Sequence, residues 1–250
     1  MQAPNPISPS PKRHLKLLTY NVHSCIGTDR QLEPERIAEV IATLEPDIIG
    51  LQELDVGRRR TGGIDQAHAI ASILEMEFHF HAALSVNEER YGDAILTALP
   101  AKMVKAGPLP SIGEQRGAVW IEVEIDGRPV QVFNTHLGLM RRDRVAQAQA
   151  LAGPEWLRHP RCSQTPVILL GDFNSITLSK AYKHIATHLK DIRNDLPAPL
   201  KPTYPSRFPL LRLDHIFVSR EIKVVDASVP VLPLTRVASD HLPLLATVEV

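Results

Sequence analysis

Residues 167–174 read VILLGDFN, an apolar run whose last residues turn abruptly polar. The same pattern occurs in LKLLTYNVH (15–23), DIIGLQE (47–53) and VQVFNTH (130–136). A short apolar run of this kind is typical of a strand that is buried on both faces. These four stretches therefore predict strands, and polar side chains gather where the strands end.

The remaining elements indicate the fold class. Residues 118–135 predict an antiparallel hairpin, because apolar and polar residues alternate from Val119 to Ile125, up to the turn signal Asp126-Gly127. A helix is predicted from Pro34, with apolar residues at 37, 40, 41 and 44 on one face. Further helices are predicted at 65–75, 142–158 and 177–187, and further strands at 93–98, 101–106, 213–219, 222–229 and 243–249. Strands outnumber helices by about two to one, which favours an α/β fold: a four-layer α/β sandwich of two mostly antiparallel sheets flanked by helices.

Composition indicates a globular chain without a strong overall field. The 250 residues contain 28 Lys+Arg and 28 Asp+Glu, so the formal net charge is zero, and 44% of the residues are hydrophobic. These values exclude extended disorder and fibrous repeats, and any preference for anions must be local. No linker or repeat marks an internal boundary. We therefore predict a flexible, proline-rich N-terminal tail at 1–13 and a single domain at 14–250.

The sequence contains no recognisable targeting signal and only two cysteines. No apolar run approaches the roughly 20 residues that span a bilayer, so no transmembrane segment is predicted. The first residues lack the apolar stretch of a signal peptide, which predicts a cytoplasmic protein. Cys25 and Cys162 are too few for a disulfide scaffold and are expected to be free thiols. No protein partner is predicted.

Short polar clusters at the strand ends are the candidate functional residues. They are Asn21 with His23, Gln52 with Glu53, Asn134 with His136, Asp172 with Asn174, and Asp214 with His215, followed by Asp240 with His241. Carboxylates, amides and imidazoles without a thiolate suit a hard divalent cation such as Mg²⁺ or Mn²⁺. Such an ion keeps several waters and leaves room for a phosphate oxygen.

Each cluster also has an ordinary structural interpretation. Glu53 alone can cap a strand, and His136 alone can be a core histidine with a satisfied hydrogen bond. GDFN (171–174) can be an Asx turn, and Ser239-Asp240-His241 a loop with a local side-chain bond. Their joint occurrence at strand ends favours a functional site over this alternative.

In these motifs the chain resembles the endonuclease/exonuclease/phosphatase superfamily, which has the DNase-I-like fold. The resemblance runs from about Leu15 to Val250 and rests on LTYNVH, IIGLQELD, GDAILT, NTHLG, GDFN, RLDHIFVS and SDHLP. The stretches NVHSCIGTD and RRRTGGIDQ look most like a bacterial branch of metal-dependent hydrolases in that superfamily.

The resemblance implies hydrolysis of a phosphoester and a role for each matching residue. It makes Glu53 the principal metal carboxylate, with Asn21 beside the metal and Asp240 facing the metal or its water shell. It makes Asp172 the residue that positions or deprotonates the attacking water. Asn174 would hold a phosphate oxygen, His136 and His241 would flank the scissile phosphate, and Asp214 would orient His241.

Physical chemistry supports the same set. Phosphodiester hydrolysis places negative charge on nonbridging and leaving oxygens, which a metal and protonated imidazoles stabilise while a carboxylate handles the water. A neighbouring carboxylate fixes the tautomer of a histidine and holds it charged. Asp93 is a candidate for this role beside His136, with a structural role at the strand edge as the alternative.

Two histidines depart from the family pattern. Position 23 is His where some nuclease relatives carry an aspartate near the metal, which places a second metal contact there in doubt. His215 occupies a position where relatives often carry an aromatic residue, and packing is favoured for it.

Basic residues are the candidates for substrate binding. Arg58, Arg59 and Arg60 follow Glu53 on a predicted loop, and Arg116 is placed at the mouth of the site; a solvated basic loop is the alternative for the run of three. Nuclease affinity comes mostly from several Lys/Arg contacts to the backbone. Zero net charge and only 5% aromatic residues therefore favour a compact phosphoester, such as a lipid head group or small phosphodiester.

Three functions follow from these residues. The preferred one is a Mg²⁺- or Mn²⁺-dependent phosphoesterase, acting on diesters rather than monoesters. The alternatives are a DNA or RNA nuclease with the same centre and a noncatalytic binding module. Because no metal or water residue is missing, the binding module is the weakest of the three.

Overall fold

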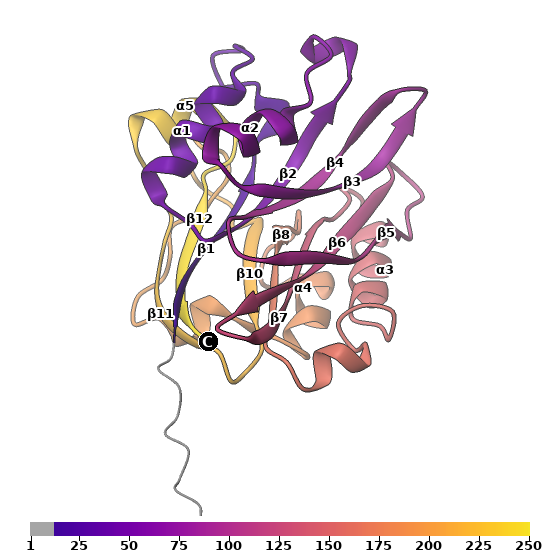
Figure 1. The fold of residues 1–250 in the computed structure, drawn as a ribbon, viewed down its shortest axis with the longest axis vertical. Coiled ribbons are helices and arrows are strands. Elements are labelled where there is room, and N and C mark those ends of the chain that lie inside the picture. The colour runs from indigo at the N-terminus through magenta and orange to yellow at the C-terminus, as the bar shows by residue number, and fades with distance from the viewer. Residues whose placement is uncertain (1–12) are drawn as a thin grey trace, which may run out of the picture.

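The computed structural model describes residues 13–250 of the chain. The predicted flexible tail therefore lies outside the described residues, apart from Arg13. The described part contains twelve strands and five α-helices, and the strands form two six-stranded sheets (Figure 1).

The first sheet has the strand order β11-β12-β1-β2-β4-β3. Its strands are β1 (His14–Asn21), β2 (Ile48–Val56), β3 (Glu77–Val86), β4 (Glu89–Thr97), β11 (Lys223–Ser228) and β12 (Leu244–Glu249). The β1–β2 pair is parallel, whereas the other four pairs are antiparallel. The chain passes from β1 to β2 through α1 (Pro34–Leu44), as a parallel pair requires.

The second sheet has the order β5-β6-β7-β8-β10-β9 and the same kind of pairing. Its strands are β5 (Ala101–Leu109), β6 (Arg116–Ile125), β7 (Arg128–His136), β8 (Val167–Asp172), β9 (Lys190–Asp191) and β10 (Asp214–Val218). Here β7–β8 is the parallel pair and the other four pairs are antiparallel. The predicted hairpin is β6–β7, and Asp126 and Gly127 both have positive φ (51° and 76°), as its tight turn requires.

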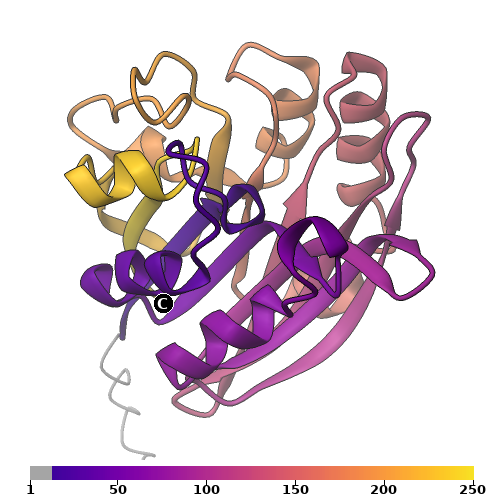
Figure 2. The same cartoon turned by 90° about the horizontal axis from the view of Figure 1, so that it is seen from above.

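Helices cover the outer face of each sheet. α1, α2 (Gln66–Leu74) and α5 (Pro233–Ala238) lie on the first sheet, and α3 (Arg141–Leu151) and α4 (Lys180–Ala186) lie on the second. Figure 2 shows the two groups of helices on opposite sides of the paired sheets. The predicted four-layer α/β sandwich with mostly antiparallel sheets is confirmed.

Burial on both faces of the sheets explains the apolar runs. Leu17 and Ile48 of the first sheet and Leu170 of the second contribute to the core between the sheets. Leu18 and Ile49, one residue along, face α1 instead. Because successive side chains alternate between faces, a strand covered on both sides must be apolar throughout.

Three sequence-based predictions of elements were incomplete. The helix predicted at 142–158 ends at Leu151, because Gly153 and Pro154 follow, and turns and a short 3-10 helix continue from there. β3 was missed because its polar and half-buried residues lack a clear alternation, and α5 was missed because it is only six residues long.

In residues 13–250, no helix combines the length and the apolar character that crossing a membrane would require.

Candidate active site

The polar strand ends meet at one end of the two sheets. In the parallel pairs, Asn21 is in register with Gln52, and His136 with Asp172. Asp214, the first residue of the antiparallel β10, lies directly opposite Asp172. The topology therefore collects residues from positions 21 to 241 around one point.

Glu53 is directed into the site by an irregularity in β2. The register of β2 against β4 shifts between Leu51 and Leu54, and Glu53 has a φ of 65°. A bulge of this kind re-aims a side chain, and a non-glycine residue with positive φ is a strained conformation that is found mostly at functional sites. Asn174, which follows Asp172, also has a positive φ, of 46°.

Asn21 connects two carboxylates. Its Nδ2 donates to Glu53 Oε1 (2.9 Å) and to Asp172 Oδ2 (3.0 Å), while its Oδ1 accepts the backbone N–H of His23 (3.0 Å). A backbone N–H can only donate, so this bond sets the orientation of the amide. The amide nitrogen of Asn21, not its oxygen, therefore faces the two carboxylates, and Oδ1 retains one lone pair beyond the His23 contact.

His241 and Asp214 form a buried ion pair. His241 Nδ1 donates to Asp214 Oδ2 at 2.9 Å, and its Nε2 lies 3.6 Å from Asp172 Oδ2. Burial by itself disfavours the charged imidazole, but Asp214 and Asp172 outweigh it and raise the pKa of His241 to about 10. These two carboxylates therefore favour the charged form of His241 at neutral pH.

Asp172 is a carboxylate poised to exchange a proton. Its side chain is 1% exposed, and burial, together with the charge of Asp214, raises its pKa to about 6. The backbone N–H of Asn174 donates to Asp172 Oδ1 (2.8 Å), which leaves Oδ2 facing Asn21 and both histidines. A carboxylate with a pKa near neutrality is suited to act as a general base.

His136 differs from the expectation of a second charged imidazole. Arg116 Nη1 donates to His136 Nδ1 at 2.8 Å, and an arginine cannot give up its proton, so Nδ1 carries a lone pair. Burial and the Arg116 charge lower the pKa of His136 to about 3. His136 is thus neutral. Its Nε2 lies 3.0 Å from Asn174 Nδ2, whose amide also donates to the Leu137 carbonyl, and 3.6 Å from Asp172 Oδ2 and 4.0 Å from Glu53 Oε1.

Asp93 does not orient His136. Its Oδ1 lies 3.4 Å from the backbone nitrogen of Glu53, from which it accepts a hydrogen bond, and burial raises its pKa to about 7. Asp93 therefore supports the bulge that carries Glu53, and Arg116 occupies the place beside His136.

Glu53, Asp240 and His23 form the more open part of the site. Their side chains are 22%, 35% and 46% exposed, and His23 Nδ1 lies 3.6 Å from Glu53 Oε2 and 3.7 Å from Asp240 Oδ1. Burial raises the pKa of Glu53, but the neighbouring imidazole of His23 and the amide of Asn21 outweigh it and bring that pKa well below its usual range. Two carboxylates at a water-accessible point fit a hard divalent cation that keeps part of its hydration shell.

A second group of possible metal ligands lies deeper. Ligand atoms of Asp172, Asp214 and His241 lie within 4.8 Å of one another, and all three residues are buried. There the two nitrogens of His241 already face the two carboxylates, so the imidazolium supplies the positive charge. The donor set of Glu53 and Asp240 therefore fits a hydrated metal better.

These groups line a cleft of about 510 Å³. Arg58, Arg60 and Tyr91 form part of its wall, with both guanidinium groups over the Tyr91 ring (5.8 and 5.5 Å to its centroid). Asp55, which is fully buried, holds Arg60 through two hydrogen bonds of 2.7 and 2.8 Å. Arg58 and Arg60 are thus held at the cleft by Asp55.

Arg59 does not belong to the wall of this cleft. Its side chain is 96% exposed, and its Nε lies 3.7 Å from Glu89 Oε1. It is the middle residue of the run and starts a 3-10 turn, which directs it away from its neighbours. The prediction that all three arginines face the substrate is therefore corrected to Arg58 and Arg60.

Two polar residues of the strand ends are structural. Asn134 Nδ2 donates to the carbonyls of Leu51 and Ala94 in the opposite sheet (2.8 and 2.9 Å), and Gln52 Nε2 donates to its Oδ1 (2.7 Å). His215 is fully buried beneath the site, where its Nε2 donates to the carbonyl of Ser175 (2.7 Å). It packs against Phe173 and Tyr182, in agreement with the packing role favoured for it.

Sequence reasoning missed three residues that shape the site. Ser239 Oγ donates to the backbone carbonyl of Asn21 (2.7 Å) and so ties the loop of Asp240 and His241 to β1. Tyr204 lies against His241, with ring centroids 4.8 Å apart, and Tyr91 lies under the arginines. Ser239 stood inside the quoted motif SDHLP, whereas no local signal marked the two tyrosines.

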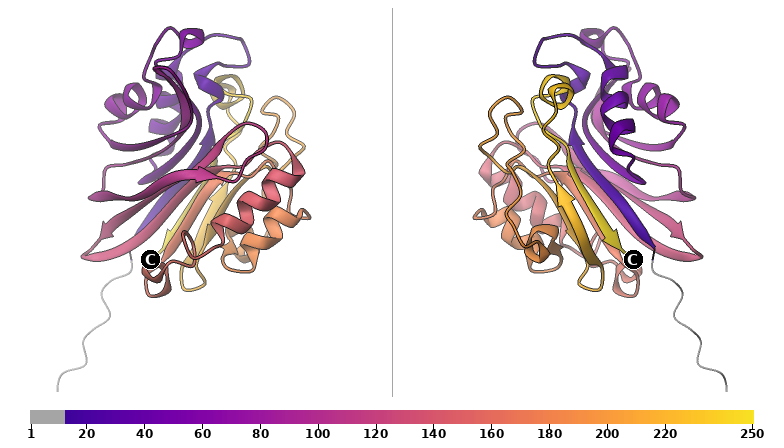
Figure 3. Two further views of the ribbon diagram at one scale, coloured as in Figure 1. Left: turned by 90° about the vertical axis from the view of Figure 1, so that its right-hand side faces the viewer. Right: turned by 90° about the vertical axis from the view of Figure 1, so that its left-hand side faces the viewer.

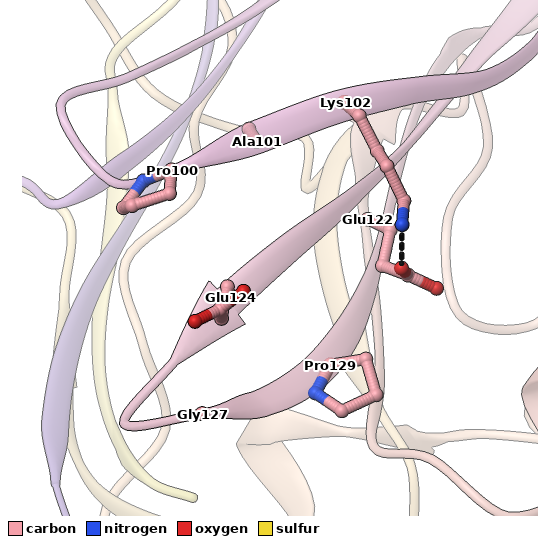
Figure 4. Close-up of a pocket in the computed structure, with 7 residues that line it drawn as sticks. All are labelled: Pro100, Ala101, Lys102, Glu122, Glu124, Gly127 and Pro129. Atoms are coloured by element: carbon pink, nitrogen blue, oxygen red, sulfur yellow. Dashed lines mark ion pairs between the residues drawn. The ribbon is translucent and has the colours of Figure 1, made fainter.

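Another hollow lies away from these residues, near the β6–β7 turn. It is lined by Pro100, Lys102, Glu122 and Pro129 among others, and Figure 4 shows Lys102 and Glu122 facing one another, at 2.8 Å. Because Glu122 is paired with Lys102 and Arg161, and none of the polar strand ends borders this hollow, we assign no function to it.

The chain matches the model of the Endonuclease/Exonuclease/phosphatase family over residues 18–241. It therefore belongs to this family, whose members are hydrolases that act on phosphoester bonds. The Escherichia coli (strain K12) protein YbhP, described as uncharacterized, is 29% identical over 256 residues, which cover 94% of this chain and 96% of YbhP.

Solved structures share the fold at lower identity. The endonuclease/exonuclease/phosphatase of Beutenbergia cavernae superposes with a TM-score of 0.79 at 23% identity, covering 95% of this chain and 72% of that one. A mannosyl-6-phosphatase of Bacteroides thetaiotaomicron gives 0.76 at 22% identity, covering 94% and 99%. The human nocturnin catalytic domain with bound sulfate gives 0.71 at 22% identity, covering 96% and 98%.

Proposed function

We propose that this protein is a divalent-metal-dependent phosphodiesterase that acts on a compact or lipid-type substrate. The observation that carries the proposal is the arrangement of charge in the cleft. Two partly exposed carboxylates, Glu53 and Asp240, lie beside a buried carboxylate of near-neutral pKa, Asp172, and a charged imidazole, His241.

Glu53 and Asp240 would hold Mg²⁺ or Mn²⁺. When bound, the ion supplies Lewis-acid stabilisation of a phosphoryl oxygen and of developing charge. Asn21 holds Glu53 and Asp172 at a set separation through its amide nitrogen. Water and phosphate oxygens are left to complete the coordination.

The buried residues would divide the proton and charge chemistry. Asp172 takes the proton of the attacking water, and His241, kept charged by Asp214, donates a hydrogen bond to a phosphate oxygen. His136 borders the phosphate as a neutral imidazole, which Arg116 positions through Nδ1. Asn174 borders the same space, where its side chain lies 3.0 Å from His136 Nε2.

The size of the site supports a compact substrate. The cleft offers three arginines on its wall, and each is already engaged with a carboxylate: Arg58 and Arg60 with Asp55, and Arg116 with Glu114. A duplex bound through 6–10 phosphates needs a wider set of unpaired cations. The phosphatase and nocturnin folds named above are compatible with small phosphoesters, and they show likeness of fold alone.

A substrate panel tests the proposal. Bis-p-nitrophenyl phosphate, p-nitrophenyl phosphate, phospholipids, plasmid DNA and RNA are assayed with Mg²⁺, with Mn²⁺ and with EDTA. We expect metal-dependent hydrolysis of the small diester or the phospholipids in preference to the monoester. Preferred cleavage of DNA or RNA would instead establish the nuclease alternative, and no hydrolysis of any substrate would favour a binding module.

A further inference from the structure

A second hollow lies beside the cleft, between α3 and α4 on the outer face of the second sheet. Its volume is about 430 Å³, and its wall includes Arg141, Arg144, Lys180, Lys183, Ser175 and Leu178. Figures 1 and 3 show α3 and α4 side by side on this face.

The hollow carries positive charge that the protein does not neutralise. Its lining contains four cationic side chains and no carboxylate. Within residues 13–250, none of the four lies within 4.0 Å of a carboxylate oxygen, whereas Arg36, Lys105 and Lys190 elsewhere do. In a chain of zero net charge, unpaired cations concentrated in one cavity indicate an anionic ligand.

Two further features provide hydrogen-bond donors at the same place. Ser175 is 2% exposed, and its Oγ has no hydrogen-bond partner in the described part of the chain. A buried polar atom of this kind calls for an explanation, and a ligand is one. α3 begins at Arg141, and its N-cap residue Met140 provides no side-chain cap, so the first N–H groups of this eleven-residue helix remain available to an anion.

The hollow and the cleft adjoin each other. Leu139 lines the cleft and Arg141 the hollow, while Asn174 lines the cleft and Ser175 the hollow. Residues that line the two cavities are thus neighbours in the chain at two places, 139–141 and 174–175.

We infer that the hollow between α3 and α4 is a second phosphate-binding subsite, which holds a phosphate group of the substrate that is not cleaved. This inference rests on the proposed function of the neighbouring cleft. The ligand chemistry is a phosphate group, which a soluble polyphosphate and a lipid head group have in common. Leu178 (76% exposed) and Ile176 (44% exposed) flank the cations and suit an apolar neighbour such as a lipid.

Equilibrium binding tests the subsite without relying on turnover. Inositol 1,4,5-trisphosphate and phosphatidylcholine vesicles with 10% phosphatidylinositol 4,5-bisphosphate are titrated by calorimetry without added metal. The variant is Arg141→Ser/Lys180→Ser. The matched control is Arg128→Ser/Arg220→Ser, which also removes two exposed cations. Arg128 is the first residue of β7, and Arg220 follows the end of β10, so both lie at the ends of these strands away from the candidate site.

We expect Arg141→Ser/Lys180→Ser to bind at least one probe at least tenfold more weakly than the wild type does. The control variant should bind both probes as the wild type does. Hydrolysis of bis-p-nitrophenyl phosphate should be unchanged in both variants. Loss for the soluble probe identifies a free polyphosphate, and loss for vesicles alone identifies a lipid head group. Unchanged affinity in the first variant, equal loss in the control, or no binding by the wild type would overturn the subsite. If binding depends on Arg141 and Lys180 but the wild type hydrolyses no ester, the subsite stands and the proposed function fails.

Discussion

His241 owes its charge to two carboxylates rather than to exposure to water. Asp214 Oδ2 accepts from its Nδ1 at 2.9 Å, and the buried Asp172 lies beyond Nε2. Burial alone would lower the pKa of this imidazole, so its positive charge depends on its neighbours.

Replacing Asp214 should therefore weaken His241 as a donor. In Asp214→Asn we expect kcat to fall by roughly 10²-fold. The pKa of His241, raised to about 10 in the native protein, should fall, so the alkaline limb of the pH–rate profile should move to lower pH. The profile is measured with bis-p-nitrophenyl phosphate at saturating metal. A collapse of metal affinity with an unchanged profile would place Asp214 at the metal instead.

Glu53 is proposed as the principal carboxylate ligand of the metal. In Glu53→Gln we expect the activity to be almost lost and Mn²⁺ affinity, measured by calorimetry, to fall by at least tenfold, because an amide is a poorer ligand than a carboxylate. Glu77→Gln, at an exposed position of β3, is the control for a lost negative charge. Native Mn²⁺ affinity in Glu53→Gln would remove this residue from the metal site.

At the scale of elements, the two sheets are held in register by polar contacts as well as by the core. One such contact is made by Asn134, which reaches across from β7 to the first sheet. Gly50 in β2 leaves room for the Asn134 side chain, because a Cβ at Gly50 would lie 2.8 Å from Asn134 Oδ1. Asn134 then bonds across to β2 and β4, the strands that support Glu53 and Asp93.

Removing this cross-sheet amide should cost stability. Asn134→Ala removes the side-chain donor to the Leu51 and Ala94 carbonyls and one of the three acceptors of the Gln52 amide, which we expect to lower the free energy of unfolding by about 2 to 3 kcal/mol. Denaturant unfolding measures the loss, and the exposed Asn194→Ala serves as the control. A loss no larger than that of the control would show that the core alone holds the sheets together.

β10 also carries a pH-sensitive contact. His215 is neutral in the folded protein, since its Nδ1 accepts from Arg193 (3.2 Å) and its Nε2 donates to Ser175, and burial lowers its pKa. The pKa of a histidine in the unfolded chain is about 6.5. Below this pH, His215 binds a proton in the unfolded chain but not in the folded one, so the free energy of unfolding decreases as the pH falls.

The pH dependence of His215 is tested by comparing unfolding free energies at pH 7.5 and 5.5. We expect His215→Gln to be less stable than the wild type at pH 7.5 but to lose less stability on acidification. An equal loss in both proteins would assign the pH dependence to other groups.

At the scale of the whole molecule, charge balance should set the salt response. The net charge is zero, and many cations of the described chain are paired with carboxylates. For a substrate with few phosphates we expect KM to change only a few-fold between 50 and 200 mM salt. A duplex substrate would lose on the order of 10³ to 10⁵ in affinity over this range. Efficient plasmid cleavage with such a steep slope would favour the nuclease.

The sequence by itself determined the architecture and most of the candidate residues. Continuous apolar runs predicted buried strands, and VILLGDFN, VQVFNTH and LKLLTYNVH placed polar residues at the strand ends. These features are local, because strand periodicity and burial are written into consecutive residues.

Only the tertiary structure decided how those residues act on one another. It placed His23 between Glu53 and Asp240, gave His136 an arginine partner instead of a carboxylate, and turned Arg59 away from the cleft. Protonation depends on distances and desolvation between segments up to two hundred residues apart in the chain. No sequence pattern contains those distances, because they are set by packing of the two sheets and by the bulge at Glu53.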